Sequence, residues 1–246
     1  MNVSYISYTQ LVAYLRCGRW YQFKYVDKIA LPTPSGIVLG RAVHAGIETN
    51  YKHKLETGKD LPIDSLLDAY NDSFEETALE VDIWELPKEK EKDLGYKLLK
   101  AYHPEISKTV HPVLVEEEEW INDPELRVNI IVKKDVETED SIIDIKTISR
   151  LPETIPFDYE LQLAMYSLYT GKKKVQLHAL GKKHLKAKVL HKEFADEELT
   201  SFREVLKQAV RGIRAGVFLP TGVNHKWACA FCEYGKLGLC EFWRAE

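Results

Sequence analysis

The stretch Ser141-Ile-Ile-Asp-Ile-Lys-Thr147 decides the fold class of this 246-residue chain. Successive side chains of an extended strand point to opposite faces, so Asp144 and Lys146 share one face while Ile143 and Ile145 share the other. A carboxylate and an amine therefore face one pocket, and the two isoleucines face an apolar layer. This alternation predicts a strand with one polar and one apolar face.

A second strand is predicted upstream, over Arg127–Val136. The short polar link Glu137–Asp140 predicts that the two strands fold back on each other as antiparallel partners, which sets Asp135 beside Asp144. Two carboxylates on adjacent strands supply oxygen ligands for Mg²⁺ or Mn²⁺, and Lys146 supplies an amine that orients water or offsets phosphate charge. The pattern indicates metal-dependent cleavage of nucleic acid.

Composition indicates an ordinary soluble protein, with 45% apolar and 29% charged residues and a formal net charge of −4. This charge argues against a general nucleic-acid coat. We find no apolar run long enough to span a membrane and no signal-peptide pattern, so we expect a cytoplasmic protein with no membrane association. The segment 171–192 nevertheless holds eight lysines and no acid. It reads as a hairpin whose lysines either follow a phosphate backbone or are simply solvated.

Helices are predicted around these strands from apolar spacing and capping patterns. The first helix is predicted to begin at the capping box of Ser7 and the second after Pro32–Gly36. An acidic helical insertion is expected at about 60–105, and two further helices are expected to begin at Phe157 and at about Asp196. Further strands are expected over Pro112–Ile121 and in the lysine-rich hairpin. The sequence shows no internal repeat.

The second predicted helix places a histidine at the edge of an apolar stripe. Its apolar residues recur every four positions: Leu39, Val43, Ile47, Tyr51 and Leu55. His44 lies next to this stripe, so its side chain is expected to reach the rim of the pocket.

The four cysteines lie near the two ends of the chain, as Cys17, Cys229, Cys232 and Cys240. Disulfides are rare in the cytoplasm, so closely spaced thiols there indicate a metal site. Four cysteines satisfy either a tetrahedral zinc ion or a 4Fe-4S cluster, and both remain open at this point. Either group would join the two ends of the chain, so that metal loss would become a folding defect.

Taken in order, these motifs resemble the PD-(D/E)xK nuclease superfamily, specifically the RecB-like nuclease domains and the CRISPR-associated exonucleases that carry an iron–sulfur cluster. The resemblance spans nearly the whole chain. It rests on Tyr14–Tyr25, Gly40–His44, Asp135, Asp144–Thr147, Gln162–Tyr166 and the C-terminal cysteines.

The resemblance implies a fold and a site. The fold is α/β, with a restriction-endonuclease-like mixed β-sheet core flanked by helices, an N-terminal helical part and a Cys-rich C-terminal metal-cluster module. The implied boundaries are 1–36 and 216–246 for the cluster module and 37–215 for the nuclease core. The implied site residues are His44, Asp135, Asp144 and the Ile145 carbonyl as ligands of Mg²⁺ or Mn²⁺; Lys146 as the catalytic lysine; Gln162 and Tyr166 as residues that contact DNA or support the site; and Cys17, Cys229, Cys232 and Cys240 as ligands of a 4Fe-4S cluster.

The resemblance further implies an exonuclease that acts on single-stranded or end-containing DNA, with protein partners left open. The spacing of seven residues before Cys240 departs from the more usual five, so zinc remains an alternative. Two other functions stay open: a zinc-stapled restriction-type endonuclease and a non-catalytic DNA-binding scaffold. The acidic run Glu116–Glu119 is interpreted as the charge of an exposed edge strand and is left out of the site.

Overall fold

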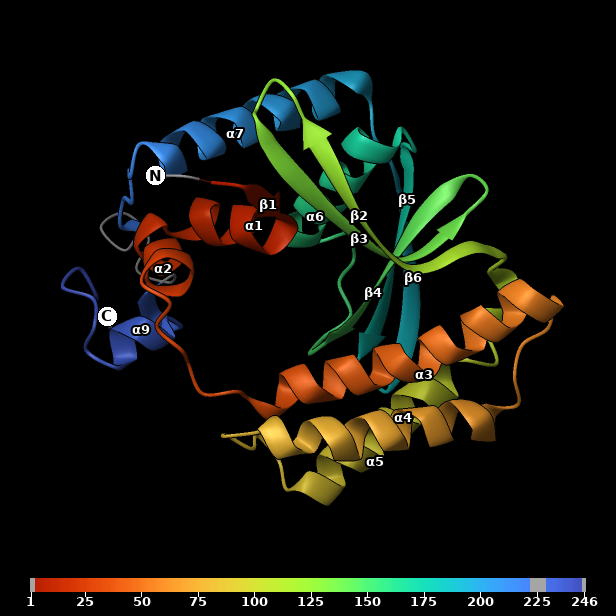
Figure 1. Ribbon diagram of the computed structural model, residues 1–246. Coiled ribbons are helices and arrows are strands. Elements are labelled where there is room, and N and C mark those ends of the chain that lie inside the picture. The colour runs from red at the N-terminus through yellow and green to blue at the C-terminus, as the bar shows by residue number, and fades with distance from the viewer. Residues whose placement is uncertain (1–2, 222–228, 245–246) are drawn as a thin grey trace. The chain divides into compact units, whose positions relative to one another are not determined.

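The computed structural model describes residues 3–221 and 229–244 (Figure 1). The chain divides into two compact units. Unit 1 comprises Met1–Leu31, Glu119–Val132 and Asp196–Glu246, and unit 2 comprises Pro32–Glu118 and Lys133–Ala195. Unit 1 thus includes both ends of the chain and, between them, the segment Glu119–Val132.

The sheet is mixed, as the sequence predicts. Its main strands are β2 (Pro112–Asp123), β3 (Val128–Thr138), β4 (Ser141–Ile148), β5 (Lys174–Gly181) and β6 (Lys186–Glu193). In unit 2, β3 pairs antiparallel with β4, β4 pairs parallel with β5, and β5 pairs antiparallel with β6. The paired residues are Val136 with Ile143 and Glu137 with Ile142, and the adjacent residue of β3, Asp135, reaches β4 through a hydrogen bond that its side chain accepts from the Ile145 amide.

Three helices of unit 2 lie side by side: α3 (Ser35–Thr57), α4 (Ile63–Thr77) and α5 (Lys88–Tyr102) (Figure 1). The predicted stripe of α3 is buried at Leu39, Val43, Ile47 and Tyr51. The prediction was wrong for Leu55, which is 45% exposed. A spacing of four residues advances about 40° beyond a full turn of an α-helix, so four such steps carry Leu55 nearly to the opposite side of α3 from Leu39.

The two faces of β4 have different neighbours. Ile143 and Ile145 belong to the buried core that includes residues of α3, α4 and α5. The opposite face carries Asp144 and Lys146, and α6 (Phe157–Thr170) packs against β4 and β5. The alternation of side chains along one strand therefore separates the apolar core from the polar site.

Unit 1 begins with β1 (Tyr5–Ser7), which pairs in parallel with the first part of β3. The Ser7 hydroxyl then accepts a hydrogen bond from the backbone amide of Gln10 at 3.3 Å and caps α1 (Tyr8–Arg16), as the capping box predicts. The unit continues with α2 (Gly18–Tyr21), η1 (Gln22–Val26), α7 (Asp196–Arg214) and α9 (Glu233–Lys236).

Gly18 allows two segments of unit 1 that are far apart in the sequence to approach each other closely. The Gly18 amide donates a hydrogen bond to the Leu219 carbonyl at 2.9 Å. A Cβ atom at position 18 would lie 2.6 Å from the backbone nitrogen of Leu219, so any larger residue would push the two segments apart. This contact holds Cys17 beside the segment that follows α7.

The lysine-rich hairpin is β5 and β6. Several of its lysines form ion pairs with carboxylates of unit 2: Lys172 with Glu137, Lys174 with Asp140, Lys188 with Glu153 and Lys192 with Glu160. This pairing favours the interpretation of a solvated hairpin over that of a phosphate track. No described helix combines the length and apolar composition needed to cross a membrane.

Candidate active site

Asp144 lies at the centre of the polar face of β4 and is fully buried. One of its carboxylate oxygens, Oδ1, accepts hydrogen bonds from Lys146 Nζ at 2.7 Å and from Gln162 Nε2 at 2.8 Å. The other oxygen, Oδ2, has no hydrogen-bond partner among the described residues. A buried carboxylate oxygen without a donor is costly, so this atom is available for a cation.

Asp135 lies beside Asp144, as the hairpin predicts. Its Oδ2 accepts a hydrogen bond from the Ile145 amide at 2.6 Å, and its Oδ1 lies 3.6 Å from His44 Nδ1. The structure therefore brings together His44, Asp135, Asp144 and Lys146, all from unit 2.

Glu116 on β2 completes a group that the sequence did not reveal. One ligand atom each of His44, Glu116 and Asp135 lie within 4.8 Å of one another, a spacing at which a single metal ion can contact all three. The interpretation of Glu116 as exposed edge charge was therefore wrong, and its side chain is only 14% exposed. The cause is local: Glu116 has φ of +51°, which breaks the strand's alternation and redirects the side chain.

Negative charge is concentrated in this group. Burial raises the pKa of Asp144 to about 6, even though the neighbouring Lys146 acts in the opposite direction. Burial also raises the pKa of Asp135, and burial together with Asp135 raises that of Glu116. Burial and the ammonium of Lys146 lower the pKa of His44, which keeps its imidazole neutral and able to bind a metal.

Lys146 keeps its positive charge inside the site. Burial acts to lower its pKa, but the carboxylates of Asp144 and Asp135 outweigh burial and raise it. Its ammonium also lies 5.8 Å from the ring centroid of Tyr159 on α6, within the range of a cation–π contact. Tyr159 was not singled out from the sequence. Its place in the first turn of α6, three residues before Gln162, is the signal that could have identified it.

Gln162 and Tyr166 support the site from α6. Both side chains are buried, and Gln162 Nε2 lies 2.9 Å from the Tyr166 hydroxyl, as expected for i,i+4 neighbours. The Gln162 amide thus links Tyr166 to Asp144. This arrangement fixes the carboxylate in one orientation.

These donors suit a hard divalent cation. The carboxylates of Glu116, Asp135 and Asp144 match the oxygen ligands preferred by Mg²⁺, and a histidine is compatible with Mn²⁺. Burial raises the pKa of Asp135 and Asp144 and so disfavours their charged forms, and Asp144 Oδ2 has no donor among the described residues; a bound cation would stabilise the ionised group. Mg²⁺ or Mn²⁺ therefore fits the residues present.

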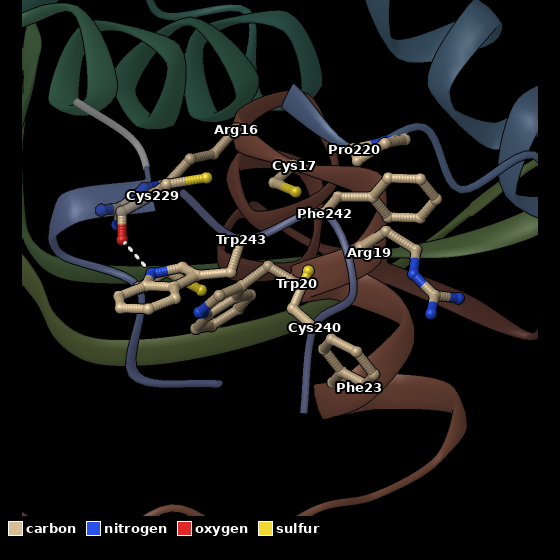
Figure 2. A pocket seen from close by; sticks show the side chains of 11 residues that line it. Arg16, Cys17, Arg19, Trp20, Phe23, Pro220, Cys229, Cys240, Phe242 and Trp243 are labelled. Atoms are coloured by element: carbon tan, nitrogen blue, oxygen red, sulfur yellow. Dashed lines mark hydrogen bonds between the residues drawn. The ribbon is translucent and has the colours of Figure 1, made fainter. Parts of the chain in front are cut away.

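The four cysteines all line one pocket in unit 1, together with aromatic side chains that include Trp20, Phe23, Phe242 and Trp243 (Figure 2). Burial raises the pKa of Cys232, with further contributions from Cys17 and Cys240. Among the described residues, no three cysteine sulfur atoms lie mutually within 4.8 Å. The indole of Trp243 donates a hydrogen bond to the Cys229 carbonyl at 2.9 Å.

The fold and the site define a nuclease with a mixed sheet and an Asp, Asp, Lys site. A family model for the PD-(D/E)XK nuclease superfamily matches residues 5–237. The chain belongs to this superfamily. Members of the superfamily generally use divalent metals, which agrees with the group formed by His44, Glu116 and Asp135.

Two solved structures share the fold. A proposed exonuclease of Eubacterium rectale is 12% identical, with a TM-score of 0.58, over 88% of this chain and 84% of its own. The protein SSO0001 is 15% identical, with a TM-score of 0.50, over 98% of this chain and 88% of its own. No curated protein matches this chain in sequence.

Proposed function

We propose that this protein is a Mg²⁺- or Mn²⁺-dependent deoxyribonuclease. The observation that carries the proposal is the joint position of Asp135, Asp144 and Lys146, with His44 and Glu116 beside them. A scaffold without catalytic activity would have no need for a buried carboxylate held by a lysine with one oxygen left free.

The protein's own side chains have distinct roles in hydrolysis. His44, Glu116, Asp135 and Asp144, with the Ile145 carbonyl, would hold the metal. When bound, the metal would acidify water and offset charge on the phosphate. The Lys146 ammonium would orient the attacking water and stabilise the negative charge that develops on the phosphate oxygens.

The reaction is a hydrolysis of the phosphodiester bond. The water oxygen forms a bond to phosphorus as the water loses a proton, and the bond from phosphorus to the 3′ oxygen breaks. The leaving 3′ oxygen takes up a proton, which gives a 5′-phosphate and a 3′-hydroxyl. No covalent intermediate with the protein is required.

Exonuclease action on single-stranded or end-containing DNA is the finer part of the proposal. It is supported by the resemblance of the motifs and by the fold shared with a proposed exonuclease.

The test is digestion of DNA labelled at one end, with Mn²⁺, as single strands and as duplexes. We compare the unmodified protein with Lys146→Ala and with Lys100→Ala, which removes an exposed lysine of α5 in the same unit. We expect cleavage by the unmodified protein and by Lys100→Ala, and loss of cleavage in Lys146→Ala. Equal cleavage by the unmodified protein and both variants would contradict the role of Lys146.

A closed circular single strand separates the two kinds of nuclease. An exonuclease leaves the circle intact and degrades the linear form of the same sequence. Cleavage of the circle would favour the restriction-type endonuclease. DNA binding without any cleavage would favour the scaffold.

We further infer that the four cysteines bind a 4Fe-4S cluster. The inference is supported by their shared pocket and by its aromatic lining. Four cysteines can hold either a cubane cluster or a single tetrahedral zinc ion, so zinc is the alternative outcome of the test.

Anaerobic purification tests this inference directly. We expect a brown protein that absorbs near ~400 nm and contains about four iron atoms and four sulfides per chain. The variant Cys232→Ala should lose the absorbance and become less stable. A colourless protein with one zinc per chain would contradict the cluster and support zinc.

A further inference from the structure

A second pocket of unit 1 combines aromatic rings with cations. It lies along α1, α2 and η1, has a volume of about 200 Å³ and is lined by side chains that include Tyr8, Val12, Arg16, Trp20, Lys24 and Tyr25. We call it the α1–η1 groove. Its volume is several times the roughly 30 Å³ that one water molecule occupies in the liquid.

Four aromatic residues follow Cys17 in the sequence, namely Trp20, Tyr21, Phe23 and Tyr25. The structure divides them. Tyr21 and Phe23 are buried, at 4% and 6% exposure, and belong to the core. Trp20 and Tyr25 are only partly buried and line the α1–η1 groove.

The cations of the groove have no acidic partner in the part of the chain that the structure describes. Lys24 Nζ lies 4.9 Å from the ring centroid of Trp20 and 5.6 Å from that of Tyr25. No carboxylate lines the groove, and within the described chain neither Arg16 nor Lys24 forms an ion pair. Two exposed cations beside two rings complement a ligand that carries both negative charge and a flat apolar face.

We propose that the α1–η1 groove binds one nucleotide of single-stranded DNA, a contact that adds to the proposed nuclease function and rests on it. A base stacks on Trp20 or Tyr25, while Arg16 and Lys24 contact the flanking phosphates. Only an unpaired strand offers a free base face, because duplex bases are stacked on each other. The groove therefore selects single strands without reading their sequence.

The test measures DNA binding by the full-length protein made inactive by Lys146→Ala. The ligands are a fluorescent single-stranded oligothymidine and an abasic strand of the same length, so that stacking and phosphate contacts are separated. The variants are Tyr25→Leu, Tyr25→Phe and Lys24→Ala. Tyr25 and Lys24 do not line the cysteine pocket, so their substitution leaves that pocket's lining in place.

We expect Tyr25→Leu to weaken binding of oligothymidine about 5- to 100-fold, with no change for the abasic strand. Tyr25→Phe keeps the ring and should bind as the parent protein does. Lys24→Ala should weaken both strands and reduce the slope of log affinity against log salt concentration by about 0.7. Arg211→Ala, which removes an exposed cation of α7 outside the groove, should leave binding and slope unchanged.

The proposal is overturned if Tyr25→Leu and Lys24→Ala both bind oligothymidine within twofold of the parent, or if the parent binds no single strand. Hydrolysis of bis(p-nitrophenyl) phosphate by the unmodified protein with Mn²⁺ tests the nuclease function separately. Hydrolysis with unaffected binding variants would refute the groove alone. Absence of hydrolysis with the expected binding pattern would refute the nuclease function alone.

Discussion

Substitution of Glu116 by glutamine gives the sharpest test of the metal group. Glutamine keeps the size of the side chain and removes its charge, whereas Glu118→Gln removes the same charge two residues further along β2. Glu118 is not a member of the group in which ligand atoms lie within 4.8 Å of one another among the described residues. A specific effect at position 116 therefore reports on the site and not on the general charge of the strand.

The size of the effect follows from charges in the structure. Two unit charges 4 Å apart interact by about 4 kcal/mol at an effective dielectric constant of about 20. Part of this attraction to the metal is offset, because in the metal-free protein Glu116 is near Asp135 and pairs with Lys133 at 3.3 Å. We expect a net loss of about 1.4 to 2.8 kcal/mol, which corresponds to Mn²⁺ binding that is about 10- to 100-fold weaker.

Isothermal titration of chelator-treated protein with Mn²⁺ measures this loss, with circular dichroism to verify folding. The rate of DNA cleavage by Glu116→Gln should recover as the Mn²⁺ concentration is raised. Glu118→Gln should bind Mn²⁺ within about twofold of the unmodified protein. The reasoning is refuted if both variants bind Mn²⁺ equally well, because Glu116 would then be no ligand.

Three other predictions concern catalysis and stability. Lys146→Ala should lower kcat about 10²- to 10³-fold without weakening Mn²⁺ binding, because the Lys146 ammonium disfavours a second cation in the site, and equal losses of both would show that the lysine acts only through the metal ligands. Burial lowers the pKa of His178 to about 3, so the folded protein binds this proton less readily than the unfolded chain, whose histidine titrates near 6.5. The free energy of unfolding therefore decreases as the pH falls below about 6.5, and it is about 2 kcal/mol lower at pH 5 than at pH 8 because of this histidine. Urea denaturation of His178→Gln should show a difference between pH 5 and pH 8 that is smaller by about this amount than in the unmodified protein. Gly95→Ala should destabilise the protein by about 1 to 3 kcal/mol because its Cβ would lie 2.1 Å from the buried Tyr70 hydroxyl, and an unchanged or higher melting temperature would contradict this packing.

The pairing of Asp135 with Asp144 could be predicted because it depends on local rules. Side chains alternate along each strand, and a link of four residues leaves few ways to join two antiparallel partners. The contact between Gln162 and Tyr166 follows from the period of one helix. Their burial did not follow, since it depends on packing against β4.

Features that depend on distant partners or on unusual backbone geometry could not be predicted. β1 has three residues, too few to show alternation, and exists through its pairing with β3. Glu116 lies in the group with His44 and Asp135 because its backbone has a left-handed conformation, which the acidic sequence around it does not predict. Leu55 was misassigned because a spacing of four residues matches the helical period only over short distances.

The polar face of β4 links these results to function. Lys146 and Gln162 both donate hydrogen bonds to Asp144 Oδ1, whereas Oδ2 has no donor among the described residues. Burial of the unsatisfied Asp144 Oδ2 destabilises the metal-free fold. The protein tolerates this cost where Asp135 and Glu116 add further negative charge, and a divalent cation is the ligand that relieves both the missing donor and the excess charge. The same deficit that destabilises the metal-free site would therefore provide free energy for binding the metal that the proposed reaction requires.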